Sequence, residues 1–190
     1  MLQTILTSFL LIFLAEMGDK TQLIALSFAA RFKLKTVIFA ILAATILNNL
    51  FATTVGSLIF KLAPSQTIRI ISYAIFIAFG LWTLFSSKNE DGKTKESRLL
   101  FNPFITVAVF FIISELGDKT QISAMLLAID SAAFFPVFIG ASAGMFAANL
   151  IGIAAGAALG KKFPLKTIKI ISAAMFIIIG ITGMVKTIAY

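Results

Sequence analysis

The sequence contains no cysteine and no histidine among its 190 residues. The lack of cysteine excludes disulfide bonds and thiolate metal sites. The lack of histidine removes the side chain that most often carries protons near neutral pH. Charged residues are also scarce, at 13%, about half of the ~25% found in soluble domains. Any metal or proton chemistry must therefore use oxygen atoms, in a chain too apolar for an ordinary soluble domain.

Long apolar runs occupy most of the chain, of which 59% is hydrophobic. A run of about 20 apolar residues is long enough to cross a hydrocarbon core of ~30 Å. We therefore predict an all-α integral membrane protein with six transmembrane helices. Their expected limits are 4–30, 36–60, 67–86, 103–129, 134–160 and 166–188.

The two halves of the chain repeat each other. Residues 67–80 align with residues 167–180, with nine of the fourteen positions identical. Residues 1–86 and 103–190 therefore form two three-helix repeats, and the polar segment 87–102 links them. Because three spans are an odd number, the second repeat enters the membrane from the opposite side. The pattern predicts inverted repeats, which are typical of transporters with a site near the midplane.

Lysine and arginine are distributed unevenly between the expected loops. Eleven lie on the side of the 87–102 linker and three on the other side, apart from the two motif lysines. The eleven are Arg31, Lys33, Lys35, Lys88, Lys93, Lys95, Arg98, Lys161, Lys162, Lys166 and Lys169, and the three are Lys61, Arg69 and Lys186. The positive-inside rule predicts a cytoplasmic linker and both termini outside.

One seven-residue motif occurs twice, once inside the first apolar run and once inside the fourth. The copies, Glu16–Gln22 and Glu115–Gln121, differ only at the second position. They contain every carboxylate that we place within the membrane: Glu16, Asp19, Glu115 and Asp118. Intramembrane charges are costly and usually functional. A Glu and an Asp three residues apart are expected on one helix face, and the repeat symmetry is expected to bring the two copies together.

The charge of the paired motifs suits a divalent cation. Four carboxylates (−4) and the lysines Lys20 and Lys119 (+2) give a net charge of −2. An all-oxygen ligand set favours Mn²⁺, Ca²⁺ or Mg²⁺ over Zn²⁺ or Cu⁺. Mg²⁺ dehydrates reluctantly, which favours Ca²⁺ or Mn²⁺. When the metal leaves, two lysines do not offset four close carboxylates, so some carboxylates are expected to take up protons.

Other residues are expected to support this site. Gly18 and Gly117 permit a bent helix or an offered carbonyl group. The lysines either pair with the aspartates to reduce the cost of burial or act as internal cations that stabilise the empty site. Three asparagines on the second and fifth spans are either ligands or interhelical hydrogen-bonding groups. The full supporting set is Lys20, Thr21, Gln22, Lys119, Thr120, Gln121, Asn48, Asn49 and Asn149.

Small residues recur at every fourth position of the second and fifth spans, on one helix face. The rows are Ala40, Ala44, Asn48, Ala52 and Gly56, and Gly140, Gly144, Ala148, Gly152, Gly156 and Gly160. Small side chains allow helices to approach closely in lipid. We expect these faces to pack the repeats together.

The duplicated Glu-x-Gly-Asp-Lys-Thr motif in a six-span repeat resembles the GDT-type family of manganese and calcium exchangers. Bacterial members of that family include MneA-type manganese exporters. The resemblance implies that Glu16, Asp19, Glu115 and Asp118 bind the transported metal, with no separate cofactor. It also implies export from the cytoplasm by alternating access in exchange for a counter-ion, for which we expect protons. The compact chain is similar to prokaryotic members, so we expect an inner-membrane location.

Two other classes fit the sequence less well. Intramembrane aspartyl proteases carry a Gly-x-Gly-Asp sequence, whereas Glu16 and Glu115 stand at the first position here and the two halves are alike. We therefore expect no enzyme. An exporter of organic cations would use aromatic side chains for cation–π contacts, but Trp82 lies far from the motif in the sequence.

Overall fold

The computed structural model describes residues 1–62, 65–85, 102–159 and 165–189, and within these ranges all regular structure is helical. The described part contains eight helices, two more than the expected spans. They are α1 (Leu2–Glu16), α2 (Lys20–Arg31), α3 (Leu34–Leu62), α4 (Ser65–Phe85), α5 (Pro103–Glu115), α6 (Lys119–Ser131), α7 (Phe134–Leu159) and α8 (Leu165–Ala189).

The two additional helices arise because each motif breaks its helix. α1 ends at Glu16 and α2 begins at Lys20, while α5 ends at Glu115 and α6 begins at Lys119. Gly18 has φ 80° and Gly117 has φ 75°, a left-handed conformation that a glycine adopts without steric cost. The expected bend is therefore a complete interruption. The expectation that Glu and Asp share one helix face is wrong, because they lie on opposite sides of this break.

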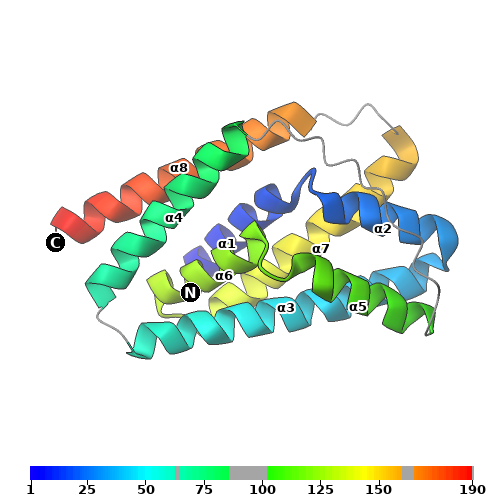
Figure 1. The fold of residues 1–190 in the computed structure, drawn as a ribbon, viewed down its shortest axis with the longest axis horizontal. Coiled ribbons are helices and arrows are strands. Elements are labelled where there is room, and N and C mark those ends of the chain that lie inside the picture. Colours follow the sequence, from blue (N-terminus) through cyan, green and yellow to red (C-terminus); the bar gives the residue numbers. More distant parts are fainter. Residues whose placement is uncertain (63–64, 86–101, 160–164, 190) are drawn as a thin grey trace.

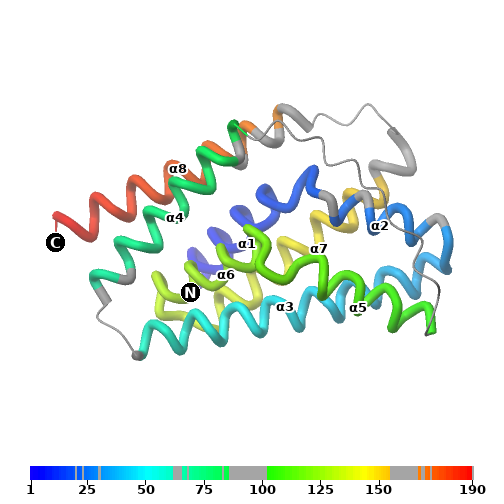
Figure 2. The backbone as a smooth tube through the Cα atoms, in the orientation of Figure 1, coloured from blue at the N-terminus to red at the C-terminus, as the bar shows by residue number. Residues whose placement is uncertain are grey.

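Each broken helix packs against a long helix from the other half of the chain. α1 and α2 lie along α7, whereas α5 and α6 lie along α3. α4 and α8 lie side by side at one edge of the molecule, as Figures 1 and 2 show. The breaks are held in place by contacts between the halves.

The small-residue rows make these close contacts possible. A Cβ atom on Gly140 would lie 2.4 Å from the Ile5 carbonyl oxygen, and one on Gly144 would lie 2.5 Å from that of Phe9. In the other half, a Cβ atom on Gly56 would lie 2.3 Å from the Met125 carbonyl oxygen. The expected packing role is confirmed for these three glycines. Gly160 lies outside the described residues.

The outer surface of the helices is rich in large apolar side chains. Phe39 is 61% exposed and Phe51 is 56% exposed on α3, and Ile178 is 58% exposed on α8. Two described helices are individually long and apolar enough to cross a membrane, over Leu34–Lys61 and Phe134–Ala154. Four shorter apolar helical segments accompany them: Leu2–Glu16, Arg69–Trp82, Pro103–Glu115 and Ala173–Ala189. Two of these, α1 and α5, are short because they stop at the motif.

Candidate cation-binding site

The glutamine side chain of each motif copy accepts a hydrogen bond across the break and stabilises the loop there. The backbone N–H of Gly18 donates to Gln22 Oε1 at 2.9 Å, and that of Gly117 donates to Gln121 Oε1 at 2.8 Å. In both copies the Asp N–H also donates to the Glu carbonyl oxygen, at 3.1 Å. The two copies therefore form the same loop, which exposes backbone groups at two helix ends.

The glutamates are buried at the end of the helices that precede the breaks. Glu16 is fully buried and Glu115 is 1% exposed. The Thr21 hydroxyl donates to Glu16 Oε1, and the Thr120 hydroxyl donates to Glu115 Oε2 at 3.2 Å. The second oxygens, Glu16 Oε2 and Glu115 Oε1, have no hydrogen-bond partner among the described residues. Each threonine thus orients its glutamate and leaves one buried oxygen for another ligand.

The aspartates occupy the N-cap positions of α2 and α6, but neither makes a side-chain capping hydrogen bond. Asp19 is instead paired with the opposite motif copy, with Oδ1 lying 3.2 Å from Lys119 Nζ. Asp118 accepts a 3.5 Å hydrogen bond from the Thr120 hydroxyl. The side chain of Lys20, the matching lysine, lies outside the described residues. The ion pair shows that the two motif copies meet.

The acidic side chains converge but are not gathered into a finished metal site. Glu115 lies close enough to Glu16, Asp118 and Asp19 to experience repulsion from all three. Even so, no three acidic side chains of the described ranges stand close enough together to hold one metal ion. In this conformation Asp19 therefore contacts a lysine and is not grouped with the other motif carboxylates around a common point.

The neighbouring long helices supply further polar groups. Gln22 Nε2 donates to the Ala148 carbonyl oxygen at 2.8 Å, which ties the first motif to α7. Asn149 is fully buried, and its Oδ1 has no hydrogen-bond partner within the described part of the chain. Asn49 is 2% exposed and donates to the Thr45 carbonyl oxygen at 3.1 Å. Asn48 is also buried, at 5% exposed.

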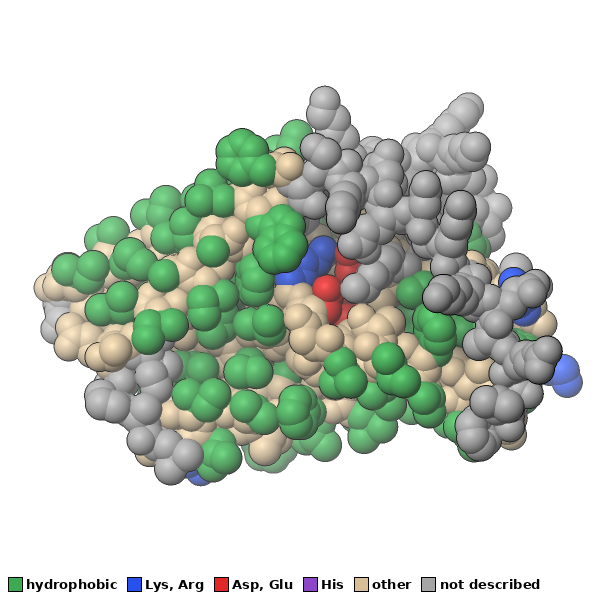
Figure 3. Space-filling model, viewed as in Figure 1, with side chains coloured by type: hydrophobic (Ala, Val, Ile, Leu, Met, Phe, Trp, Pro, Cys, Tyr) green, Lys and Arg blue, Asp and Glu red, His purple; other side chains and the backbone are tan. Residues whose placement is uncertain are grey.

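The site opens toward one face of the molecule. Asp19 is 16% exposed and Lys119 is 28% exposed at the side chain. Figure 3 shows acidic and basic side chains in a hollow in the middle of a largely apolar face. The pair is therefore partly shielded from the surroundings and differs from an exposed surface salt bridge.

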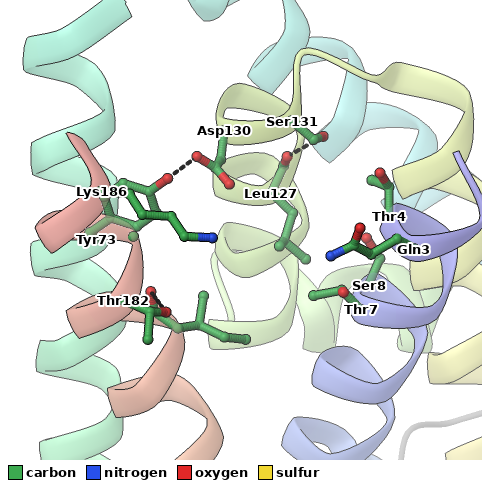
Figure 4. A pocket seen from close by; sticks show the side chains of 12 residues that line it. Gln3, Thr4, Thr7, Ser8, Tyr73, Leu127, Asp130, Ser131, Thr182 and Lys186 are labelled. Atoms are coloured by element: carbon green, nitrogen blue, oxygen red, sulfur yellow. Dashed lines mark hydrogen bonds between the residues drawn. The ribbon is translucent and has the colours of Figure 1, made fainter. Parts of the chain in front are cut away.

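A second polar region surrounds Asp130, to which the sequence analysis assigned no role. The structure places Asp130 in the last turn of α6, where its Oδ1 accepts a hydrogen bond from the Tyr73 hydroxyl of α4. These residues line a pocket of about 310 Å³ together with Lys186 and the first turns of α1 (Figure 4). The pocket lies at the end of α1 and α6 that is remote from the motif. Nothing in the sequence around Asp130 predicts its hydrogen bond with Tyr73.

Comparison with known protein families decides what kind of protein this is. Residues 4–91 and 103–189 match the family described as "Divalent cation/proton antiporter GDT1". The chain belongs to the GDT1 family. It is therefore a membrane-embedded cation transporter and not an enzyme, which confirms the expectation drawn from the motif.

Individual relatives agree with this assignment. A Vibrio cholerae protein whose name proposes manganese export is 30% identical over 88% of this chain and 84% of its own length. The GDT1-like protein sll0615 of Synechocystis is 26% identical over 96% of this chain and 97% of its own length. The chloroplast protein PAM71 of Arabidopsis thaliana is 27% identical over 90% of this chain, which spans 54% of that protein. No solved structure matches the chain.

Proposed function

We propose that this GDT1-family protein exports Mn²⁺ from the cytoplasm in exchange for protons, with Ca²⁺ as the alternative substrate. The family description and the manganese-related name of the Vibrio cholerae relative support the substrate class. The oxygen-only ligand set supports Mn²⁺ or Ca²⁺ over softer ions. We place the protein in a prokaryotic inner membrane with the 87–102 linker in the cytoplasm.

The architecture that we propose is a pair of inverted three-helix repeats. In this reading α1 with α2, and α5 with α6, each cross the membrane as one discontinuous span. Both termini lie toward one end of the molecule, while α5 begins near the opposite end beside the α2–α3 connection (Figure 1). Discontinuous helices at a repeat interface are the usual ion-binding elements of such transporters, because their ends offer unpaired backbone groups.

The cation would bind between the two motif copies. Glu16, Asp19, Glu115 and Asp118 would supply the charged ligands. Three buried oxygens with no hydrogen-bond partner in the described residues support this assignment: Glu16 Oε2, Glu115 Oε1 and Asp19 Oδ2. Buried polar atoms are normally paired, so unpaired acidic oxygens at one place favour a cation as the missing partner. Thr21, Gln22, Thr120, Gln121 and the three asparagines would support the site.

The exchange would follow from competition at the same oxygens. An incoming divalent cation would balance the net charge of −2 that the four carboxylates and the two motif lysines leave. After release toward the outside, protons would take the place of the metal, because close buried carboxylates do not all remain charged. Alternating access would then carry protons inward and metal outward. The contact between the motif copies through Asp19 and Lys119 is the observation that carries this proposal, because it joins the moving halves at the ligands.

Reconstitution into liposomes tests the proposal. Purified protein is placed in vesicles that contain a Mn²⁺-sensitive dye, and an outward proton gradient is imposed. We expect Mn²⁺ uptake that follows the gradient and collapses with a protonophore, and weaker uptake of Ca²⁺. Flux that ignores the pH gradient and follows a Na⁺ gradient would contradict proton exchange. Flux of neither metal would contradict the proposed substrates.

A further inference from the structure

Lys119, the motif lysine of the second repeat, does not form its ion pair with the adjacent Asp118. Lys119 is the first residue of α6, directly after Asp118, yet its ammonium group lies 3.2 Å from Asp19 in the other half of the chain. The ammonium group is also attracted by Asp118 and Glu16. It therefore sits among carboxylates of both copies, in the space where a bound cation would be stabilised.

We propose that Lys119 is a resident counter-cation that competes with the transported metal ion for Asp19. In the conformation described, Lys119 occupies Oδ1 of Asp19, while Oδ2 has no hydrogen-bond partner among the described residues. A metal ion that takes Asp19 as a ligand must displace the ammonium group. When the metal leaves, the ammonium group returns and the empty site is not left with four uncompensated carboxylates.

The chemistry of lysine suits this exchange. Its ammonium group is a compact charge on a flexible four-carbon stem, so it can move off one carboxylate without a backbone rearrangement. The Lys119 side chain is 28% exposed, which leaves room for that movement. It is also anchored at the helix start, since the Lys119 carbonyl oxygen accepts a 2.5 Å hydrogen bond from Ser123. Only the side chain needs to move.

The functional consequence is a limit on affinity. A site of four carboxylates without an internal cation would bind a divalent ion tightly and release it slowly. A tethered ammonium group lowers the net affinity for metal and favours release, as a carrier requires. This inference rests on the proposed function, because it assumes that the motif carboxylates bind the transported cation.

The test compares Lys119→Met and Lys119→Arg with the wild-type protein and with Lys61→Met. Lys61 is exposed in the last turn of α3, so its replacement removes the same charge away from the motif. Mn²⁺ binding is measured by calorimetry on purified full-length protein in lipid nanodiscs. We expect Lys119→Met to lower the Kd for Mn²⁺ by about tenfold and to slow Mn²⁺ flux in liposomes, whereas Lys61→Met matches the wild type. Lys119→Arg keeps the charge and should retain the wild-type Kd within a few-fold.

Thermal unfolding separates competition from a purely structural role. If Lys119 neutralises Asp19 only in the empty site, Lys119→Met lowers Tm without metal, and saturating Mn²⁺ removes the deficit by binding the folded state. A structural lysine would give the same deficit with and without Mn²⁺. An unchanged or higher Kd, or a persistent deficit, would overturn the inference. Wild-type protein that neither binds nor moves Mn²⁺ or Ca²⁺ would instead overturn the proposed function.

Discussion

At the scale of single residues, Gly117 serves the backbone and not the packing. Gly117 has φ 75°, and a Cβ atom added there would meet nothing within 4 Å. A side chain would therefore have room, and its cost would come from the left-handed backbone alone. That conformation is unfavourable for most residues by roughly 1–2 kcal/mol, while asparagine tolerates it better.

Replacement of Gly117 tests this backbone role. We expect Gly117→Val to lower the free energy of unfolding by about 1–2 kcal/mol and to reduce Mn²⁺ flux, because the loop that presents Glu115 and Asp118 is strained. Gly117→Asn should cause clearly smaller losses of unfolding free energy and of Mn²⁺ flux. Thermal unfolding and liposome flux measure the two effects. Equal behaviour of the Val and Asn variants would show that the positive φ is not the reason for the glycine.

The motif aspartates provide the sharpest test at this scale. We expect Asp19→Asn and Asp118→Asn each to reduce Mn²⁺ flux more than about tenfold, because each would remove a charge from the proposed cation site. Metal-dependent proton movement should fall together with the Mn²⁺ flux, since Mn²⁺ and protons would use the same carboxylates. Glu16→Gln and Glu115→Gln should act in the same direction.

A matched control lies on α6, the helix that begins directly after Asp118. Asp130→Asn changes the one described acidic side chain outside the motif copies, and it should leave both fluxes largely intact. The flux of Mn²⁺ and of protons is recorded in the same vesicles with a metal dye and a pH dye. A motif variant that still moves protons on addition of Mn²⁺ would contradict the shared-carboxylate mechanism.

At the scale of the helices, the sequence predicted the helical elements better than their interruption. Apolar runs marked α3, α4, α7 and α8 to within a few residues, because a backbone that faces lipid must satisfy its hydrogen bonds within a helix. The same runs gave no sign that α1 would end at Glu16. A glycine within a helical run is compatible with a bend as well as a break, and only the packing against α7 and α3 decides between them.

The candidate site shows the same limit. The duplication of the motif predicted that the two copies meet, and the contact between Lys119 and Asp19 agrees with it. That the four carboxylates form one cation site stays a prediction. The cross-pairing of Lys119 with Asp19 was not predicted, because the lysine is next to Asp118 in the sequence. The pairing depends on the direction of α6 after the break, and that direction is set by tertiary packing. The hydrogen bond between Tyr73 and Asp130 was not predicted either, because the two residues are far apart in the sequence.

The close contact between α1 and α7 yields a prediction for this element pair. Gly144→Ala should lower the free energy of unfolding by about 1–3 kcal/mol, because its Cβ atom would lie 2.5 Å from the Phe9 carbonyl oxygen. α1 would have to move away and carry Glu16 with it, so Mn²⁺ flux should fall as well. Ala143→Leu, at an exposed position of the same helix, is the control. Unchanged stability of Gly144→Ala would show that this contact is less tight than the structure indicates.

The link between α4 and α6 should affect stability rather than transport. Tyr73→Phe removes the hydroxyl group that donates to Asp130 and leaves the carboxylate without that bond. We expect a loss of about 1–3 kcal/mol in the free energy of unfolding, with Mn²⁺ flux per folded molecule close to that of the wild type. Thermal unfolding gives the first quantity, and flux normalised to folded protein gives the second. A large loss of flux at full stability would assign the pocket a role in ion passage.

At the scale of the whole molecule, charge and shape together argue for one orientation. The positive-inside rule acts on loops near the ends of spans, and from the sequence we expect eleven of the lysines and arginines outside the motif copies on the side of the 87–102 linker. Arg31, Lys33 and Lys35 surround the α2–α3 connection, which lies near the start of α5 (Figure 1). Lys61 lies toward the end where both termini are found. The positions of these four described residues are therefore consistent with the predicted orientation.

The natural absence of cysteine makes this orientation directly measurable. We expect a cysteine introduced at Leu34, which is 51% exposed at the start of α3, to react with a membrane-impermeant thiol reagent only after the cells are permeabilised. A cysteine at Thr67, exposed at the start of α4, should react in intact cells. Both substitutions leave the loop charges unchanged, and the wild-type protein, which has no cysteine, gives the background. Labelling with the opposite pattern would reverse the orientation that the charge distribution predicts. Equal labelling of both positions in intact cells would show two orientations in one membrane, which the strong charge bias should prevent.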